Sequence, residues 1–141
     1  MIEVFCDGGA RGNPGPAAWG FVIKKDGRTI KEDCGYIGIA TNNFAEYTAL
    51  VKALSYLRKN FEGESAKVYL DSKLAVSQIS GEYKIKNLNI AKLVKQVGEI
   101  EKGLGSIVYT HIPREQNKEA DKLVNIALNK NFYIRSQNTD G

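Results

Sequence analysis

The first forty residues consist of short apolar runs separated by glycine-containing turns. Runs rich in apolar and β-branched residues predict three strands, at 2–6, 17–25 and 28–38. The pair Asp26-Gly27 between the second and third runs is typical of a two-residue hairpin turn, so these two strands should be antiparallel. The chain therefore opens with a three-stranded meander.

The rest of the chain alternates between helical and strand patterns. Apolar residues at helical spacing predict a helix over 43–58, and the asparagines before it can cap its free amides. Further strands are expected at 66–71 and 106–112, and further helices at 72–79, 88–102 and 115–130. Strands joined through helices form parallel pairs with right-handed crossovers. We therefore expect an α/β fold, a five-stranded mixed sheet with helices packed on its faces.

The length of 141 residues fits one domain. Residues 1–130 carry every predicted element and should form that domain. The connector at 81–87 is polar, and so is the segment 131–141, which we expect to be a loose C-terminal tail.

Composition is that of an ordinary globular protein, with 43% hydrophobic and 26% charged residues. These values exclude disordered, collagen-like and disulfide-dense classes. No apolar run approaches the ~18 residues of a membrane span, and no signal sequence begins the chain, so we expect a cytoplasmic protein without membrane contact. Cys6 and Cys34 belong to no C-x-x-C pair, which disfavours zinc and redox roles. The net charge of +4 permits a nucleic-acid partner but does not require one.

Two aspartates follow apolar strand patterns directly. Asp7 comes at the end of the first run and Asp71 at the end of the fourth. Ligands of open α/β sheets bind outside the carboxyl ends of strands, so the two carboxylates would share a crevice if these strands are parallel neighbours. Turn and cap formation by Asp-Gly and Asp-Ser explains either residue alone equally well.

Two further acids lie beside apolar helical stripes. Glu46 begins the stripe that should face the sheet, where an unpaired carboxylate is costly, and no Lys or Arg falls in register beside it or Asp7. Asp121 adjoins the stripe of the last helix; taken alone, a surface aspartate stabilised by the helix dipole is the better interpretation. Four such acids together suit Mg²⁺ or Mn²⁺, which prefer oxygen ligands.

Other chemistries lack their motifs. The glycine-rich stretch 8–16 contains neither of the common nucleotide-binding loop patterns. The chain has a single histidine and no serine in a nucleophile elbow, so a hydrolytic triad is disfavoured. Metal-assisted chemistry on phosphate remains.

Five short motifs occur in the order found in one known family. They are Asp7-Gly8-Gly9, Gly12-Asn13-Pro14-Gly15, Thr41-Asn42-Asn43 before Glu46, Asp71-Ser72, and Asn117 with Asp121. Each is weak alone, but together they are specific. Over residues 1 to about 130 the sequence resembles a type 1 ribonuclease H.

The resemblance implies an endoribonuclease that hydrolyses the RNA strand of RNA–DNA hybrids and leaves 5′-phosphate and 3′-hydroxyl ends. It implies that two Mg²⁺ or Mn²⁺ ions are held by four catalytic carboxylates, those of Asp7, Glu46, Asp71 and Asp121. Two such ions can lower the pKa of the attacking water and stabilise the leaving oxygen.

The resemblance also implies a set of substrate-binding residues. Asn13 and Asn43 match positions that read RNA 2′-hydroxyls, which distinguishes RNA from DNA without reading base sequence. Asn42 and Thr41 match contacts to the DNA strand, Thr41 toward a phosphate. The remaining members of the set are Gly8 and Asn117. Turn and cap roles are the alternative for the asparagines and Thr41, and both roles can hold at once.

The sequence departs from the family pattern in three places. The loop that often carries a histidine is short and contains Pro113, so we expect His111 to end a strand and Arg114 to contact a phosphate or assist product release. The basic protrusion is missing, since 81–87 is brief and holds two lysines. We expect no hybrid-binding module before Met1. The basic excess is therefore spread over Arg11 and the lysines at 84, 86, 92 and 95.

Two competing functions and one question about substrate stay open. The first is a module that binds hybrids or double-stranded RNA without cutting them. The presence of all four acids argues against it, because binding alone does not require them. A kinase of the related superfold would need a second lobe, for which the chain is too short. Double-stranded RNA stays open as a further substrate or partner, and we expect a monomer.

Overall fold

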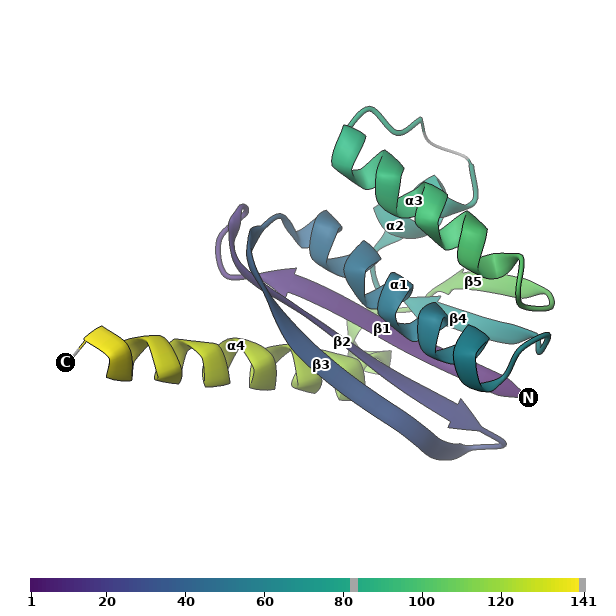
Figure 1. Ribbon diagram of the computed structural model, residues 1–141, viewed down its shortest axis with the longest axis horizontal. Coiled ribbons are helices and arrows are strands. Elements are labelled where there is room, and N and C mark those ends of the chain that lie inside the picture. The colour runs from purple at the N-terminus through teal and green to yellow at the C-terminus, as the bar shows by residue number, and fades with distance from the viewer. Residues whose placement is uncertain (82–83, 140–141) are drawn as a thin grey trace.

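The computed structural model describes residues 1–81 and 84–139, with side chains described no further than Asn131. The chain forms a twisted sheet with helices on both faces (Figure 1). The strands are β1 (Ile2–Ala10), β2 (Gly15–Lys25), β3 (Arg28–Ala40), β4 (Ala66–Leu70) and β5 (Ile107–His111). The helices are α1 (Asn42–Asn60), α2 (Lys73–Ile79), α3 (Leu88–Glu101), the 3₁₀ turn η1 (Arg114–Gln116) and α4 (Lys118–Thr139).

The five strands lie in the order β3-β2-β1-β4-β5, which confirms the predicted mixed sheet. β2 pairs antiparallel with both β1 and β3, whereas β4 is parallel to both β1 and β5. Because β1 is central, its two ladders differ in direction. The carboxyl ends of β1 and β4 meet at one edge of the sheet.

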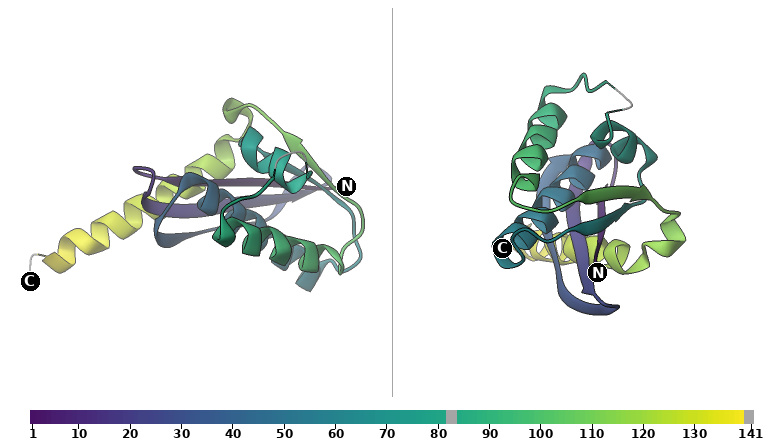
Figure 2. Two further views of the ribbon diagram at one scale, coloured as in Figure 1. Left: turned by 90° about the horizontal axis from the view of Figure 1, so that it is seen from above. Right: turned by 90° about the vertical axis from the view of Figure 1, so that its right-hand side faces the viewer.

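The two faces of the sheet are covered by different helices (Figure 2). α1 packs on β1 and β2 and against α3, while α4 packs on β2, β3 and β1. The larger core lies under α1, where Val4, Leu50, Leu54 and Val68 are at most 1% exposed. Alternating side chains of the strands thus bury one set under α1 and the other, such as Ala18, under α4.

Most element boundaries differ from those expected by at most two residues, and three differ by more. β1 continues to Ala10 instead of ending at Cys6, because β2 keeps pairing with it across the glycines. The last helix is preceded by η1 and begins at Lys118, since Asn117 departs from helical dihedral angles. The expected loose tail was wrong as far as Thr139, because no glycine or proline interrupts the chain before Gly141 and α4 continues.

Some expectations fall partly on residues outside the described ranges. The connector 81–87 includes residues 82 and 83, and the tail includes residues 140 and 141, so these parts of both predictions lie outside the described chain. Cys6 and Cys34 are both free thiols. Within the described residues, no helix has both the length and the apolar character that crossing a bilayer requires.

Candidate active site

Asp7 lies just beyond the parallel part of the central strand. The parallel ladder of β1 with β4 ends at the pair Cys6 and Leu70, whereas the antiparallel ladder with β2 continues through Asp7 and its partner Gly20. Asp7 is therefore inside β1, although the sequence placed it at the strand end. Its side chain still occupies the crevice beyond the carboxyl ends of the parallel pair, and it is only 3% exposed.

Gly8 brings the first turns of α1 against the central strand. A Cβ atom at this position would overlap the backbone of Ala45 and Glu46. Only a glycine lets the helix approach so closely. The close approach sets the half-buried Glu46 next to Asp7 from the α1 face.

Gly20 does the same for α4 on the opposite face. A Cβ atom there would lie 2.9 Å from Leu123 Cβ and 3.0 Å from the Ala120 carbonyl oxygen. Because Gly20 is the ladder partner of Asp7, the first turn of α4 lies beside that aspartate. Asp121 therefore approaches from the α4 face, and its charge acts on Asp7.

Asp71 follows β4 directly and is held by a buried amide. Asn117, 1% exposed, donates from Nδ2 to the Cys6 carbonyl oxygen at 2.8 Å and to Asp71 Oδ2 at 3.3 Å. These bonds tie the start of α4 to the ends of β1 and β4. The buried Asn117 thus positions Asp71, and its expected contact with the substrate stays a prediction.

The electrostatics of Asp7 reflect all three neighbouring acids. Burial, followed by the charges of Asp71, Asp121 and Glu46, raises the pKa of Asp7 from 3.8 to about 8. The raised pKa shows that the folded chain holds negative charge here at a cost. A cation in the crevice would remove that cost.

Glu46 also has a raised pKa. Burial and the charge of Asp71 raise it from 4.5 to about 7, while the Ser72 side chain and the Arg114 guanidinium act in the opposite direction. No Lys or Arg falls in register beside Glu46 in the sequence, and Arg114 reaches it from η1, far away along the chain. The buried Oε2 atom of Glu46 nevertheless has no hydrogen-bond partner among the described residues.

A cavity of about 380 Å³ opens beside Asp7 and Asp121. Its other walls include Arg11 from the β1–β2 turn and Arg114 from η1. Arg114 is exposed and enters this cavity, whereas His111 is the last residue of β5, as expected. The cavity thus combines carboxylates with two guanidinium groups that stay charged at any physiological pH.

The predicted substrate-binding asparagines tie the β1–β2 turn to α1. Asn42 Oδ1 accepts from the Ala10 backbone N–H at 2.8 Å, and Asn13 Oδ1 accepts from the Asn42 N–H at 3.0 Å. Among the described residues nothing accepts from the Nδ2 group of either side chain, so both donors are free for a ligand. Gly8 is buried under α1 and allows the close packing of that helix; its expected contact with the substrate stays a prediction.

Asn43 lies in a hydrogen-bond network that the sequence did not predict. Its Nδ2 group donates to Gln78 Oε1 at 3.2 Å, and the same oxygen accepts from the Tyr47 hydroxyl at 3.2 Å. The buried Asn43 Oδ1 has no partner in the described structure. The 2′-hydroxyl contact that the family resemblance implies for Asn43 stays a prediction.

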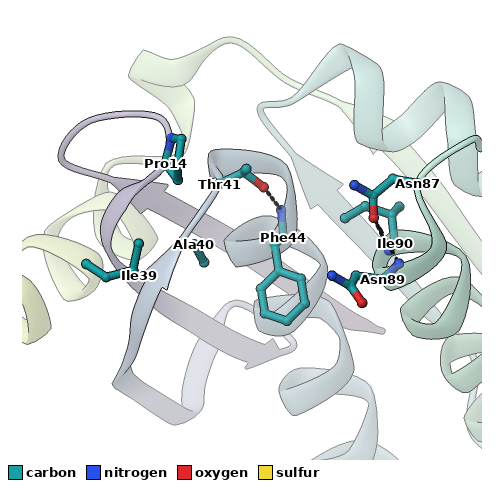
Figure 3. A pocket seen from close by; sticks show the side chains of 8 residues that line it. All are labelled: Pro14, Ile39, Ala40, Thr41, Phe44, Asn87, Asn89 and Ile90. Atoms are coloured by element: carbon teal, nitrogen blue, oxygen red, sulfur yellow. Dashed lines mark hydrogen bonds between the residues drawn. The ribbon is translucent and has the colours of Figure 1, made fainter.

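A second hollow, of about 240 Å³, lies between the start of α1 and the start of α3 (Figure 3). Thr41 Oγ1 accepts from the Phe44 N–H at 3.2 Å, which confirms its capping role. Asn87 Oδ1 caps α3 by accepting from the N–H groups of Asn89 and Ile90. The Nδ2 groups of Asn87 and Asn89 point into the hollow in Figure 3. We call this hollow the amide pocket; it is lined by Pro14, Ile39, Ala40, Thr41, Phe44, Asn87, Asn89 and Ile90. The position of Asn87 just before a helical pattern could have indicated its capping role. The sequence did not predict that it lines a pocket.

The family model described as reverse transcriptase-like matches residues 5–127. This range contains all four carboxylates and the elements that place them. LC11-RNase H1, 41% identical and covered over 99% of its length, decides the family. The chain belongs to the type 1 ribonuclease H family.

The solved structures and curated relatives agree with this family. LC11-RNase H1, solved in complex with an RNA/DNA hybrid, has a TM-score of 0.89 and 41% sequence identity over 94% of this chain and 99% of that one. RNase H1 of the halophilic archaeon Halobacterium salinarum has a TM-score of 0.86 and 36% identity, covering 92% and 98% of the two chains.

Some relatives are longer proteins. A bifunctional protein of Mycobacterium tuberculosis is 41% identical over 129 residues, which are 90% of this chain but 35% of that protein. The chain likewise spans 64% of the curated ribonuclease HI of Halobacterium salinarum. It therefore matches only part of the length of these curated relatives.

Ribonucleases H depend on divalent metals, and the donor set here fits such ions. Hard carboxylate oxygens, one buried oxygen without a partner and a raised pKa at Asp7 all favour a divalent cation. Among the side chains that the structure describes, no group of three or more His, Cys, Asp or Glu residues lies close enough together to hold a metal ion as it stands. The four acids are near enough for the charges of Asp71, Asp121 and Glu46 to raise the pKa of Asp7.

Proposed function

We propose that this chain hydrolyses the RNA strand of RNA–DNA hybrids in a reaction that depends on Mg²⁺ or Mn²⁺. The observation that carries the proposal is the burial of Asp7 beside three other carboxylates, at a cost that a bound cation removes. LC11-RNase H1, 41% identical, is titled as a complex with an RNA/DNA hybrid. We place the active unit in residues 1–130.

Two ions per site would be held by Asp7, Glu46, Asp71 and Asp121. When bound, such ions lower the pKa of a water molecule and stabilise the charge that develops on the phosphate oxygens. The chain's own residues position the four carboxylates. Asn117 fixes the Asp71 carboxylate, and the glycine contacts hold Glu46 and Asp121 on opposite sides of Asp7.

The substrate would be oriented by donors around the cavity. Arg114 presents a charged guanidinium to a phosphate in the same cavity as Asp7. The free Nδ2 groups of Asn13 and Asn42, and the unpartnered Asn43 Oδ1, can hydrogen-bond to sugar hydroxyls and strand atoms. Reading 2′-hydroxyls in this way selects RNA without reading base sequence. The products would be 5′-phosphate and 3′-hydroxyl ends.

The test is cleavage of matched substrates with each metal in turn. An RNA–DNA hybrid, an RNA duplex and a DNA duplex of one sequence are incubated with Mg²⁺, Mn²⁺ or EDTA. We expect cleavage of the RNA strand of the hybrid with metal only. Hybrid binding without cleavage in excess Mg²⁺ would overturn the proposal in favour of a binding module, and cutting of the RNA duplex would widen the substrate class.

A further inference from the structure

Arg11 lies on the β1–β2 turn, away from the four carboxylates but beside the same cavity. Its guanidinium donates from Nη2 to Asn129 Oδ1 at 2.5 Å. This bond links the turn to α4, which passes near it at the same end of the sheet (Figure 1).

The turn that carries Arg11 is fixed on its other side as well. The Arg11 N–H donates to the Pro16 carbonyl oxygen at 2.8 Å, which closes the turn. The neighbouring Ala10 N–H donates to Asn42 on α1. The guanidinium is held by α4, and the backbone of the turn that carries it is held by α1. Such a side chain loses less freedom when it binds a ligand, so less of the interaction energy is offset by ordering.

The charge of Arg11 is not neutralised by the protein. No carboxylate forms an ion pair with it in the described part of the chain. Asn129 accepts one of its five N–H donors and leaves the others to the cavity that also holds Asp7, Asp121 and Arg114. A fixed guanidinium without a counter-ion, beside a site for phosphate chemistry, suits a second phosphate.

We propose that Arg11, held in place by Asn129, binds a phosphate of the RNA strand next to the one that is cleaved. The assignment rests on the proposed function, because it takes the strand in the cavity to be RNA. The strand that reaches the carboxylates must continue along the same cavity. Arg114 and Arg11 would then contact successive phosphates of that strand, and Asn129 is a positioning residue that acts through Arg11.

The test compares the steady-state kinetics of hybrid cleavage by the intact chain and four variants. For Arg11→Gln we expect KM to rise about tenfold, the loss of one charged hydrogen bond, with kcat within about twofold. The slope of log(kcat/KM) against log salt should fall by about one. Arg11→Lys should keep the salt slope but not the full affinity, and Asn129→Ala should raise KM about threefold. Arg28→Gln, on the hairpin at the other end of the sheet, is the matched control and should change neither parameter.

Uncharged phosphate substitutes identify the strand. A single methylphosphonate in the RNA, next to the cleaved position, should raise KM for the wild-type protein but not further for Arg11→Gln. Equal KM and salt slope in Arg11→Gln and Arg28→Gln would overturn the inference. It would also be overturned if a methylphosphonate in the DNA strand raised KM for the wild-type protein but not further for Arg11→Gln. Absence of any cleavage by the wild-type protein would instead refute the proposed function, so the two failures are distinguishable.

Discussion

The carboxylate cavity and the amide pocket lie on either side of the start of α1, and they use different physics. Asn42 lines the cavity while its neighbour Thr41 lines the amide pocket. The cavity gathers like charges at a cost that raises the pKa of Asp7 and Glu46. The amide pocket holds neutral groups whose acceptors already cap helices. We therefore expect the reaction in the cavity and strand binding alone at the amide pocket.

The largest effect should come from removing one charge of the cavity. Asp7→Asn keeps the size of the side chain but loses a metal ligand, so hybrid cleavage should fall more than about 10³-fold, equivalent to several kcal/mol of transition-state stabilisation. Single-turnover cleavage in excess Mg²⁺ measures it. Asp33→Asn, an exposed isosteric control on β3, should retain full activity. Residual activity of Asp7→Asn within tenfold of wild type would contradict the proposed role of the cavity.

The close approach of α1 can be tested separately from charge. Gly8→Ala places a methyl group against the backbone of Ala45 and Glu46, so the free energy of unfolding should fall by about 3 kcal/mol. The adjacent Gly9→Ala is the matched control, because its Cβ would lie 3.8 Å from Val124 Cγ1, an ordinary contact. We expect its unfolding free energy within about 0.5 kcal/mol of wild type. Urea denaturation compares the two, and equal stabilities would show that α1 does not need the glycine.

The cavity should make stability depend on pH in a way that the amide pocket cannot. The pKa of Asp7 and Glu46 is raised on folding, so their contribution is full below pH 4 and is lost as pH rises through about 7 and 8. Without metal, the unfolding free energy should fall by at least about 2 kcal/mol between pH 5 and pH 9. Mg²⁺ should restore it at pH 9, since the ion binds only the folded chain.

Thermal unfolding of Asp7→Asn and Glu62→Gln sharpens this comparison. The first variant should lose most of the pH dependence, because its side chain cannot ionise. The exposed Glu62 should have no influence on the curve when it is replaced. A wild-type protein that becomes more stable with rising pH in EDTA would contradict the electrostatic account.

The smallest effect is expected in the amide pocket. Thr41→Val removes the cap bond to the Phe44 N–H and should cost about 1 kcal/mol of stability, with a few-fold rise in KM for the hybrid and unchanged kcat. Thr41→Ser keeps the hydroxyl and should restore both values. A large loss of kcat in Thr41→Val would place chemistry, rather than strand binding, near this pocket.

The sequence predicted the elements that depend on local patterns. The alternation of apolar runs gave the sheet, and acids at strand ends indicated where Asp7 and Asp71 would meet. Contacts between distant segments were not accessible in this way. Arg114 beside Glu46, the Asn117 bond to Asp71 and the pair Arg11 with Asn129 each join elements far apart in the chain. The local pattern of apolar and polar residues does not indicate which distant segments come into contact, so these bonds could not be predicted from it.

The most direct test of the central claim is a Mg²⁺ titration followed by carboxyl ¹³C NMR of the folded chain. The account predicts that the resonances of Asp7, Glu46, Asp71 and Asp121 shift together in response to Mg²⁺, while that of Glu62 does not. If those four resonances stay unchanged at saturating Mg²⁺, or shift no more than that of Glu62, the carboxylates do not act as one cation site and the account is contradicted.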